Sequence, residues 1–332
     1  MKNLIICVTL FVVILQGCKT TNEGEIYQSV RDNIVSVKSQ IKEIDLEDVA
    51  LGRMTGMVDV EKYILFHDYN SQDKLLHLFE KTTFKKVASF GDVGQGPCEI
   101  SNMGGVSWNE MTKELLVLDM GSYNMYSYNI DSVVSNPGYK PSVKMKMNST
   151  SFPVGCYCIN DTMSVCQVMM PINSGGFDMC TGFLNLKTGD ITKKPYNRAD
   201  VHKRRFELAV SRKHNLYAEC NLLYDLISVF DLDGKLKYNI YGPQWEELGL
   251  STAKMCLFAD EYLIVMYDGS KYEEYKYANK CFVFSLTGQY IATLQIDYNI
   301  TAACYDELND DLIFAFDDEM QFGSLKLRDV LK

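Results

Sequence analysis

The sequence predicts an all-β fold, a six-bladed β-propeller whose last blade is closed by an N-terminal strand. Short apolar runs rich in β-forming residues recur along the chain, and no amphipathic helical pattern of comparable strength accompanies them. A hairpin motif also repeats roughly every 50 residues. Because propellers repeat a four-stranded unit at about this period, the repeat favours a propeller over other all-β folds.

Four apolar segments carry the clearest strand signal, and each is bounded by turn residues. They cover residues 63–66, 115–118, 263–266 and 312–315. Runs of this length are typical of strands and too short for most helices.

The repeated hairpin occurs at residues 183–189, 229–234 and 283–288, and each copy ends in a glycine. The spacing is 45 residues from Gly189 to Gly234 and 54 residues from Gly234 to Gly288. These intervals match the length of one propeller blade.

This repeat divides the chain into six units, at 51–91, 92–148, 149–197, 198–243, 244–298 and 299–332. The last unit has room for only three strands. We therefore expect a strand near residues 35–44 to supply the fourth and to remove the open sheet edges. Residues 35–332 are predicted to form one domain, since repeat folds of this length are common.

The first 17 residues have the pattern of a secretion signal. A charged start is followed by an apolar run over residues 4–15 and then by Gly17 and Cys18. That run is too short for a spanning helix, which needs about 20 apolar residues. Residues 15–18, Leu-Gln-Gly-Cys, resemble the lipobox of bacterial lipoproteins. An ordinary cleaved signal with Cys18 at its boundary is the alternative.

The lipobox resemblance implies that Cys18 carries the lipid and becomes the first residue of the mature protein. Acyl chains would then hold the protein on the membrane, because stable anchoring takes at least two of them. Residues 18–34 are expected to form a short polar tether. Lys19, where an aspartate would signal inner-membrane retention, favours the outer membrane and leaves the periplasmic or surface face open.

The charge and cysteine content exclude some partners and chemistries. A formal net charge of -10 disfavours nucleic acid and anionic lipid surfaces as partners, because both would be repelled. Nine of the eleven cysteines follow Cys18, and an odd number cannot pair completely within the chain. No C-x-x-C pair occurs. Most thiols lie in apolar runs, so we expect Cys156 and Cys158 to pack on one strand face rather than to bind metal or form a disulfide.

A glycine-rich segment between the first two units resembles a known family. Residues 91–99 read Gly-Asp-Val-Gly-Gln-Gly-Pro-Cys-Glu and are similar to the G-x-G-P-x-E joint of TolB-like six-bladed propeller lipoproteins; the residues that carry the resemblance are Gly91, Gly94, Gly96, Pro97 and Glu99. Cys98 stands where the motif would have glycine. The resemblance covers nearly the whole chain and implies a propeller fold and an envelope location, without an assigned activity. We interpret the segment as a structural linker, because no helix follows it to support phosphate binding.

Acidic residues follow the second strand in five of the six units, where a propeller gathers its loops around one mouth of the central channel. They are Asp68, Asp119, Asp225, Asp268 and Asp317; the third unit has Pro171. A ring of carboxylates could bind a cation, sugar hydroxyls or a peptide ammonium group. Alternatively, each aspartate bonds its own backbone in a turn.

Aromatic and basic side chains are predicted at the same mouth. The candidate ligand-binding residues are His67, Tyr69, Arg204, Arg205 and Trp245, and Trp245 is the strongest candidate for a platform. Aromatic faces suit sugars and peptides, but such residues also fill the junctions between blades.

No motif of a known catalytic class is present: there is no G-x-S-x-G elbow, H-E-x-x-H helix or Walker loop. The sequence therefore favours a non-catalytic envelope module, with no cofactor or metal, that binds a protein, a peptide or a glycan. A hydrolase or lyase that uses Asp68 and Asp268 as acid and base is the alternative. A purely structural partner of a membrane complex is a third hypothesis.

Overall fold

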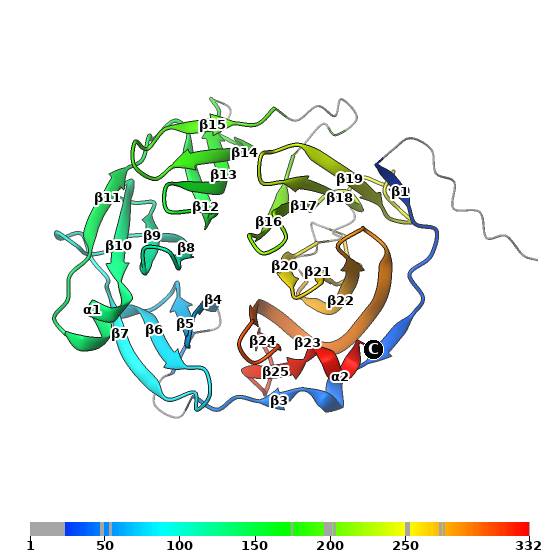
Figure 1. The fold of residues 1–332 in the computed structure, drawn as a ribbon, viewed down its shortest axis with the longest axis horizontal. Coiled ribbons are helices and arrows are strands. Elements are labelled where there is room, and N and C mark those ends of the chain that lie inside the picture. The colour runs from blue at the N-terminus through cyan, green and yellow to red at the C-terminus, as the bar shows by residue number, and fades with distance from the viewer. Residues whose placement is uncertain are drawn as a thin grey trace, which may run out of the picture.

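A computed structural model of the chain describes residues 24–46, 50–52, 55–173, 175–195, 201, 204–249, 253–271, 274 and 276–331. The predicted signal, Cys18 and the first residues of the predicted tether lie outside this range. Antiparallel sheets are arranged around a central axis, with strands β4, β8, β12, β16 and β20 nearest the centre (Figure 1).

The first three sheets each contain four strands in sequence order. The first consists of β4 (Thr55–Val60), β5 (Tyr63–Asp68), β6 (Lys74–Glu80) and β7 (Lys86–Asp92). The second consists of β8 (Met103–Asn109), β9 (Glu114–Asp119), β10 (Asn124–Asn129) and β11 (Ser142–Lys146). The third consists of β12 (Phe152–Cys158), β13 (Met163–Pro171), β14 (Phe177–Asn185) and β15 (Ile191–Lys193).

The fourth sheet has a fifth strand from the N-terminal end of the chain. It consists of β16 (Phe206–Ser211), β17 (Leu216–Asn221), β18 (Leu226–Asp231) and β19 (Leu236–Tyr241), and β1 (Glu25–Tyr27) lies beside β19 in parallel.

The remaining strands form one continuous sheet, which we call the fifth sheet. It runs through β20 (Met255–Ala259), β21 (Tyr262–Tyr267), β22 (Ala278–Ser285), β23 (Tyr290–Asp306), β24 (Asp311–Phe316), β25 (Phe322–Lys326) and β3 (Lys42–Glu43). The first part of β23 pairs with β22 and its last part with β24, while β2 (Ile34–Ser36) pairs with β23 in parallel.

Helices are minor elements in the described part of the chain. They are α1 (Ile130–Ser135), α2 (Leu327–Val330) and the 3-10 turn η1 (Lys38–Gln40). None of these is long and apolar enough to cross a membrane.

Both sequence signals for the fold are confirmed. The four apolar segments lie within β5, β9, β21 and β24. The three repeated motifs form the turns between β14 and β15, β18 and β19, and β22 and β23. Gly189, Gly234 and Gly288 have φ angles of 79°, 85° and 83°, a conformation that glycine adopts without strain.

Hydrophobic clusters hold neighbouring sheets together. Along β9, Leu115 and Val117 pack with residues of the first sheet, whereas Leu116 and Leu118 pack with residues of the third. This alternation follows from the two-residue period of a strand, and it makes β9 apolar on both faces. Each sheet is therefore covered on two sides, which explains the unbroken apolar runs in the sequence.

Cysteines contribute to these clusters as packing residues. All nine cysteines in the described segments are free, and eight of them are buried. Cys156 and Cys158 belong to the same cluster between the second and third sheets, as predicted from their spacing. Tyr157, between them on β12, is directed to the other face.

The N-terminal arm differs from the expected tether. Residues 25–27 form β1, and Arg31 places its guanidinium 4.6 Å from the ring centroid of Phe282. Arg31 Nη1 also lies 2.9 Å from Asp225 Oδ1, and 6% of the Arg31 side chain is exposed. Part of the segment predicted as a tether is therefore built into the fourth and fifth sheets.

The first and last sheets meet at a buried ion cluster. Lys81 Nζ lies 2.7 Å from Asp59 Oδ2 and 2.9 Å from Asp306 Oδ1, and Lys81 is 3% exposed. Burial raises the pKa of Asp59 to about 6, although the neighbouring Lys81 cation opposes this change. The lysine thus neutralises two carboxylates that come from opposite ends of the chain.

We predict that Lys81→Met lowers the free energy of unfolding by about 3–5 kcal/mol, because it leaves the buried carboxylate of Asp306 and the partly buried carboxylate of Asp59 without their cation. Urea unfolding measures this loss. The control is Lys113→Met, which removes an exposed ion pair with Glu61 and should cost less than about 1 kcal/mol. Equal losses in both variants would contradict a structural role for the buried cluster.

Candidate functional site

The predicted acidic residues hold loops in place. Asp68 Oδ2 accepts a hydrogen bond from the Gly52 amide at 2.7 Å, and Asp68 Oδ1 accepts one from Asn70 at 2.9 Å. Asp119 Oδ1 likewise accepts bonds from the amides of Asn102, at 2.9 Å, and Gly121, at 3.1 Å. Each carboxylate ties its own turn to the segment that enters the innermost strand of the same sheet.

The corresponding positions in the last strands follow the same pattern. Asp268 accepts hydrogen bonds from the amide and hydroxyl of Ser270 and lies 3.6 Å from Lys254 Nζ, just before β20. The Asp317 amide donates to the Asn299 carbonyl oxygen at 2.9 Å, and the carboxylate of Asp318 accepts from the Asn299 amide. Asp68, Asp119 and Asp268 therefore each accept a hydrogen bond from a backbone amide of their own turn, as the alternative interpretation of the sequence predicts.

Asp225 has a different partner. Its carboxylate pairs with Arg31. It also packs against the backbone of Gly242, where a Cβ atom would lie only 1.8 Å from Asp225 Oδ2 and would therefore clash. Burial raises the pKa of Asp225, although the Arg31 cation opposes this change. This buried pair attaches the N-terminal arm to the turn between β17 and β18.

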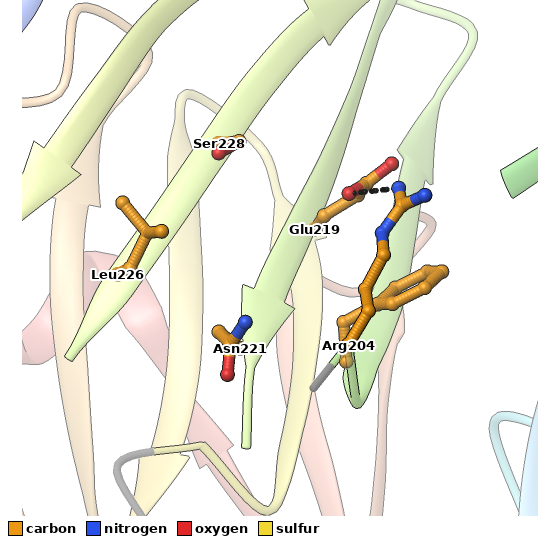
Figure 2. Close-up of a pocket in the computed structure, with 6 residues that line it drawn as sticks. Arg204, Glu219, Asn221, Leu226 and Ser228 are labelled. Carbon is orange, nitrogen blue, oxygen red and sulfur yellow. Dashed lines mark hydrogen bonds and ion pairs between the residues drawn. The ribbon is translucent and has the colours of Figure 1, made fainter. Parts of the chain in front are cut away.

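The two predicted arginines are also engaged within the sheets. Arg204 pairs with Glu219 beside the ring of Phe206, and Figure 2 shows the ion pair on the inner strands of the fourth sheet. The recess that surrounds this pair leaves no room for a water molecule. Arg205 Nη2 donates to the Phe177 carbonyl oxygen at 2.8 Å.

His67 is buried against the backbone of β4. A Cβ atom on Gly56 would lie 2.2 Å from His67 Cε1, so only glycine leaves space for the imidazole. His67 is 6% exposed, and burial lowers its pKa to about 4. The imidazole is therefore neutral near pH 7 and packs edge-on against Tyr69, with ring centroids 5.0 Å apart.

Trp245 lies at the outer rim, away from the innermost strands. Its ring packs 4.8 Å from that of Tyr241 on β19 and 6.3 Å from that of Tyr27 on β1, the two outermost strands of the fourth sheet. The structure does not bring Trp245 together with Tyr69.

The glycine-rich linker forms a compact turn. The Gly96 amide donates to Glu99 Oε2 at 2.8 Å, and a Cβ atom on Gly94 would lie 1.9 Å from the same oxygen. Gly91, in β7, has a φ of 77°, and Pro97 begins the turn that Cys98 completes. Cys98 has a φ of 67°, a conformation that is uncommon for residues other than glycine. This agrees with the family motif, which has glycine at this position.

Three other side chains form what we call the central site: Tyr69, Tyr157 and Glu207. Glu207 lies on β16 and Tyr157 on β12, both innermost strands, and Tyr69 follows β5 (Figure 1). As whole residues, Tyr157 is 39% exposed and Tyr69 is 40% exposed. Sequence reasoning identified only Tyr69 as a candidate.

The charge of Glu207 bears on both tyrosines. After burial, it is the largest cause that raises the pKa of Tyr157 and of Tyr69. The three residues belong to three different sheets.

Glu207 is the unusual member of the central site. No residue in the described segments donates a hydrogen bond to its carboxylate or forms an ion pair with it. Burial raises its pKa to about 7. Glu207 is partly buried, and its carboxylate has no hydrogen-bond or ion-pair partner among the described residues, which makes it a candidate for contact with a ligand.

A local signal for Glu207 was present in the sequence. Its neighbours Phe206 and Leu208 are buried together between the third and fourth sheets, so alternation places Glu207 on the opposite face of an apolar strand. A carboxylate inside an apolar strand is uncommon and indicates a functional role.

We predict that Glu207→Gln stabilises the protein more at pH 8 than at pH 5. The folded state raises the pKa of this carboxyl from 4.5 to about 7, so it holds the proton more tightly than the unfolded chain and loses stability as pH rises between these values. The gain at pH 8 should be about 1–3 kcal/mol, measured by urea unfolding. Glu247→Gln, in an exposed loop, is the control; a pH-independent gain would contradict the prediction.

Comparison with known proteins identifies the fold of this chain but does not assign the chain to a family. No protein-family model matches the sequence, and no curated protein matches it. Four similar solved structures are each less than 15% identical to this chain.

Three solved structures illustrate the likeness. A member of the DUF4221 family from Bacteroides vulgatus has a TM-score of 0.57 at 13% identity and covers 86% of this chain and 94% of its own. XC5397 from Xanthomonas campestris, described as a gluconolactonase, has a TM-score of 0.55 at 12% identity and covers 87% of this chain and 90% of its own. The Cps50 (Swd1) β-propeller domain from Myceliophteria thermophila has a TM-score of 0.54 at 8% identity and covers 84% of this chain and 98% of its own. The chain is thus a β-propeller by fold, and the likeness does not single out the TolB-like lipoproteins.

Proposed function

We propose that the protein is a lipid-anchored β-propeller of the bacterial cell envelope that binds a ligand or partner at the central site. The observation that carries this proposal is the carboxylate of Glu207 on the innermost strand β16, which has no hydrogen-bond or ion-pair partner among the described residues. A binding role fits this arrangement, because polar groups that converge near the centre of a propeller can recognise a ligand.

The proposed architecture has six blades. Four are the sheets that begin with β4, β8, β12 and β16, and the fifth sheet supplies two more, which share β23. Strand β3 pairs with β25 and would complete the sixth blade, and the Lys81 cluster joins that blade to the first. A closed ring removes exposed sheet edges.

The proposed location rests on the sequence pattern at Cys18 and on the TolB-like linker. Residue 25, where β1 begins, is seven positions after Cys18, and this segment spans at most about 25 Å when extended. The fourth sheet would therefore remain near the membrane. Lys19 favours the outer membrane.

Binding is favoured over catalysis by the contacts of the candidate acid and base. Asp68 and Asp268 each hold the loops of their own sheet. These hydrogen bonds stabilise the ionised form of both carboxylates, which makes them weaker general acids. Among the described residues, no group of three or more histidine, cysteine or acidic side chains is placed to hold a metal ion.

We predict that Cys18 is acylated in cells. Labelling with a radioactive fatty acid should mark the parent protein, and Cys18→Ser should remove the label and release the protein from the membrane fraction. Globomycin should cause the unprocessed form to accumulate. Labelling that persists in Cys18→Ser would contradict lipid attachment at this residue.

We predict that ligands or partners contact the face around Tyr69. A photoreactive phenylalanine analogue at position 69 should crosslink to an envelope component in intact cells, and Glu207→Gln should reduce the yield. The control position is Leu308, which is 64% exposed in the turn between β23 and β24, at the opposite end of the strands. Equal adducts from both positions, or none from position 69, would contradict binding at this face.

A further inference from the structure

We propose that a cavity between the second and third sheets binds a small organic carboxylate with a short apolar chain. We call it the outer cavity, because residues of β11 and β15, the outermost strands of these two sheets, line it (Figure 1). The central site, in contrast, has Tyr157 and Glu207 on innermost strands. The inference goes beyond the proposed function and does not depend on it.

The outer cavity is large enough for a small ligand. Its volume is about 290 Å³, and ligand sites in proteins begin at about 300 Å³. The second sheet contributes Met145 on β11 and Met147 just after it, and the third sheet contributes Leu184 on β14 and Ile191 on β15. All four side chains belong to the hydrophobic cluster between these sheets, so the wall of the cavity is continuous with the core.

These four side chains favour a flexible apolar chain as ligand. The side chains of Met145 and Met147 are unbranched thioethers, which adapt to irregular shapes. Leu184 is buried, whereas Met145, Met147 and Ile191 are only partly buried. A ligand that covers them removes apolar surface from water, and each methylene group that it buries strengthens binding by up to about fourfold.

Polar groups of the lining offer hydrogen-bond donors to an anionic head group. The Ser151 hydroxyl oxygen is buried and has no hydrogen-bond partner. The Lys193 ammonium group forms no hydrogen bond or ion pair with a described residue. Asn148 Oδ1 accepts bonds from the Thr150 amide, at 2.9 Å, and hydroxyl, at 2.8 Å, which leaves the side-chain N–H groups of Asn148 to donate. A carboxylate, which only accepts hydrogen bonds, fits such a lining.

The strand β15 directs Lys193 to the side of the cavity. Residues two apart on a strand share a face, so Lys193 shares the face of Ile191. Lys193 lies opposite Gly182 in the pairing with β14. A Cβ atom on Gly182 would lie only 2.7 Å from Val168 Cγ2 and 2.8 Å from Ile191 Cγ2, so this face of the sheet is the apolar one. The stem of Lys193 therefore follows the apolar wall, and its ammonium group stays at the solvent edge.

The charge of the lining matches an anion with a single charge. Lys146 and Lys193 contribute two positive charges and Asp190 one negative charge, which leaves one positive charge. This balance is opposite in sign to the net charge of -10 of the chain. The Asp190 carboxylate accepts a hydrogen bond from the Thr188 hydroxyl at 2.7 Å. One carboxylate neutralises this lining, whereas a phosphate monoester, with a charge of about -2, exceeds it.

The test uses the full-length protein in detergent micelles, with hexanoate as probe and with 1-hexanol and n-hexylammonium as its neutral and cationic counterparts. Ligand-observed NMR titration near neutral pH, corrected with empty micelles, should give a dissociation constant for hexanoate that is at least about threefold lower than for either counterpart. Butyrate, which is two methylene groups shorter, should bind at least about fivefold more weakly than hexanoate.

Two lysine variants assign the head group to the outer cavity. Lys193→Gln should weaken hexanoate binding about three- to fivefold and change 1-hexanol binding by less than about twofold. Lys235→Gln is the matched control, since it removes the same charge from an exposed turn between β18 and β19. It should change the binding of both probes by less than about twofold, because exposed charges at a distance are screened.

Two methionine variants assign the apolar chain. Met147→Trp should fill the outer cavity and weaken the binding of both hexanoate and 1-hexanol at least about tenfold. Met111→Trp is the matched control, because Met111 is 48% exposed in the turn between β8 and β9, and it should bind both probes as the parent does. Urea unfolding checks that each variant is folded. The lysine variants change exposed side chains and decide the inference even if Met147→Trp does not fold.

Three results would overturn this inference. They are equal binding of hexanoate and 1-hexanol, equal effects of Lys193→Gln and Lys235→Gln, and parent-like binding by a folded Met147→Trp variant. Crosslinking from position 69 tests the central site separately, so failure of the outer cavity and failure of the proposed function are distinguishable.

Discussion

The buried ion cluster at Lys81 is the contact on which the arrangement of the sheets depends. One ammonium group there neutralises Asp59 from the first sheet and Asp306 from the last. Hydrophobic packing between neighbouring sheets is non-directional and tolerates small displacements, but a buried cation between two carboxylates defines one geometry.

Most acids near the loops serve the fold, and this explains why Glu207 stands apart. Asp68 and Asp119 accept backbone hydrogen bonds that fix the entry to an innermost strand, and Asp268 accepts one from Ser270 in its own turn. A carboxylate that accepts such bonds replaces lost hydration with protein dipoles. Glu207 accepts no such bond from the described residues, and burial raises its pKa. The number of acids at the mouth of a propeller is therefore a poor measure of the charge available to a ligand.

The N-terminal arm connects the predicted membrane anchor to the fold. Strand β1 extends the fourth sheet, and Arg31 reaches Asp225 between two aromatic rings of β22. A buried guanidinium that pairs with a carboxylate and stacks on aromatic faces loses little conformational freedom per contact. Because of this attachment, the chain leaves the domain from a defined place at the outer edge of the fourth sheet.

Strands and hairpins were predictable because they depend on local patterns. Apolar runs such as residues 115–118 reflect packing on both faces of a strand, and Gly234 reflects the backbone conformation of one turn. The common face of Cys156 and Cys158 follows from the same two-residue period. Trp245, in contrast, was expected near the channel mouth, and its place at the rim depends on contacts with Tyr27 and Tyr241.

The sequence by itself determined the strand content, the repeat, the hairpin turns and the apolar environment of the thiols, because each is specified by residues close together in the chain. Only the tertiary structure decided which charged groups are neutralised. Arg31 with Asp225, Lys81 with Asp306 and Arg204 with Glu219 are pairs that come from different strands or loops. Whether a carboxylate has a partner depends on such distant residues, so the lack of one for Glu207 among the described residues became visible only after the sheets had been placed around it.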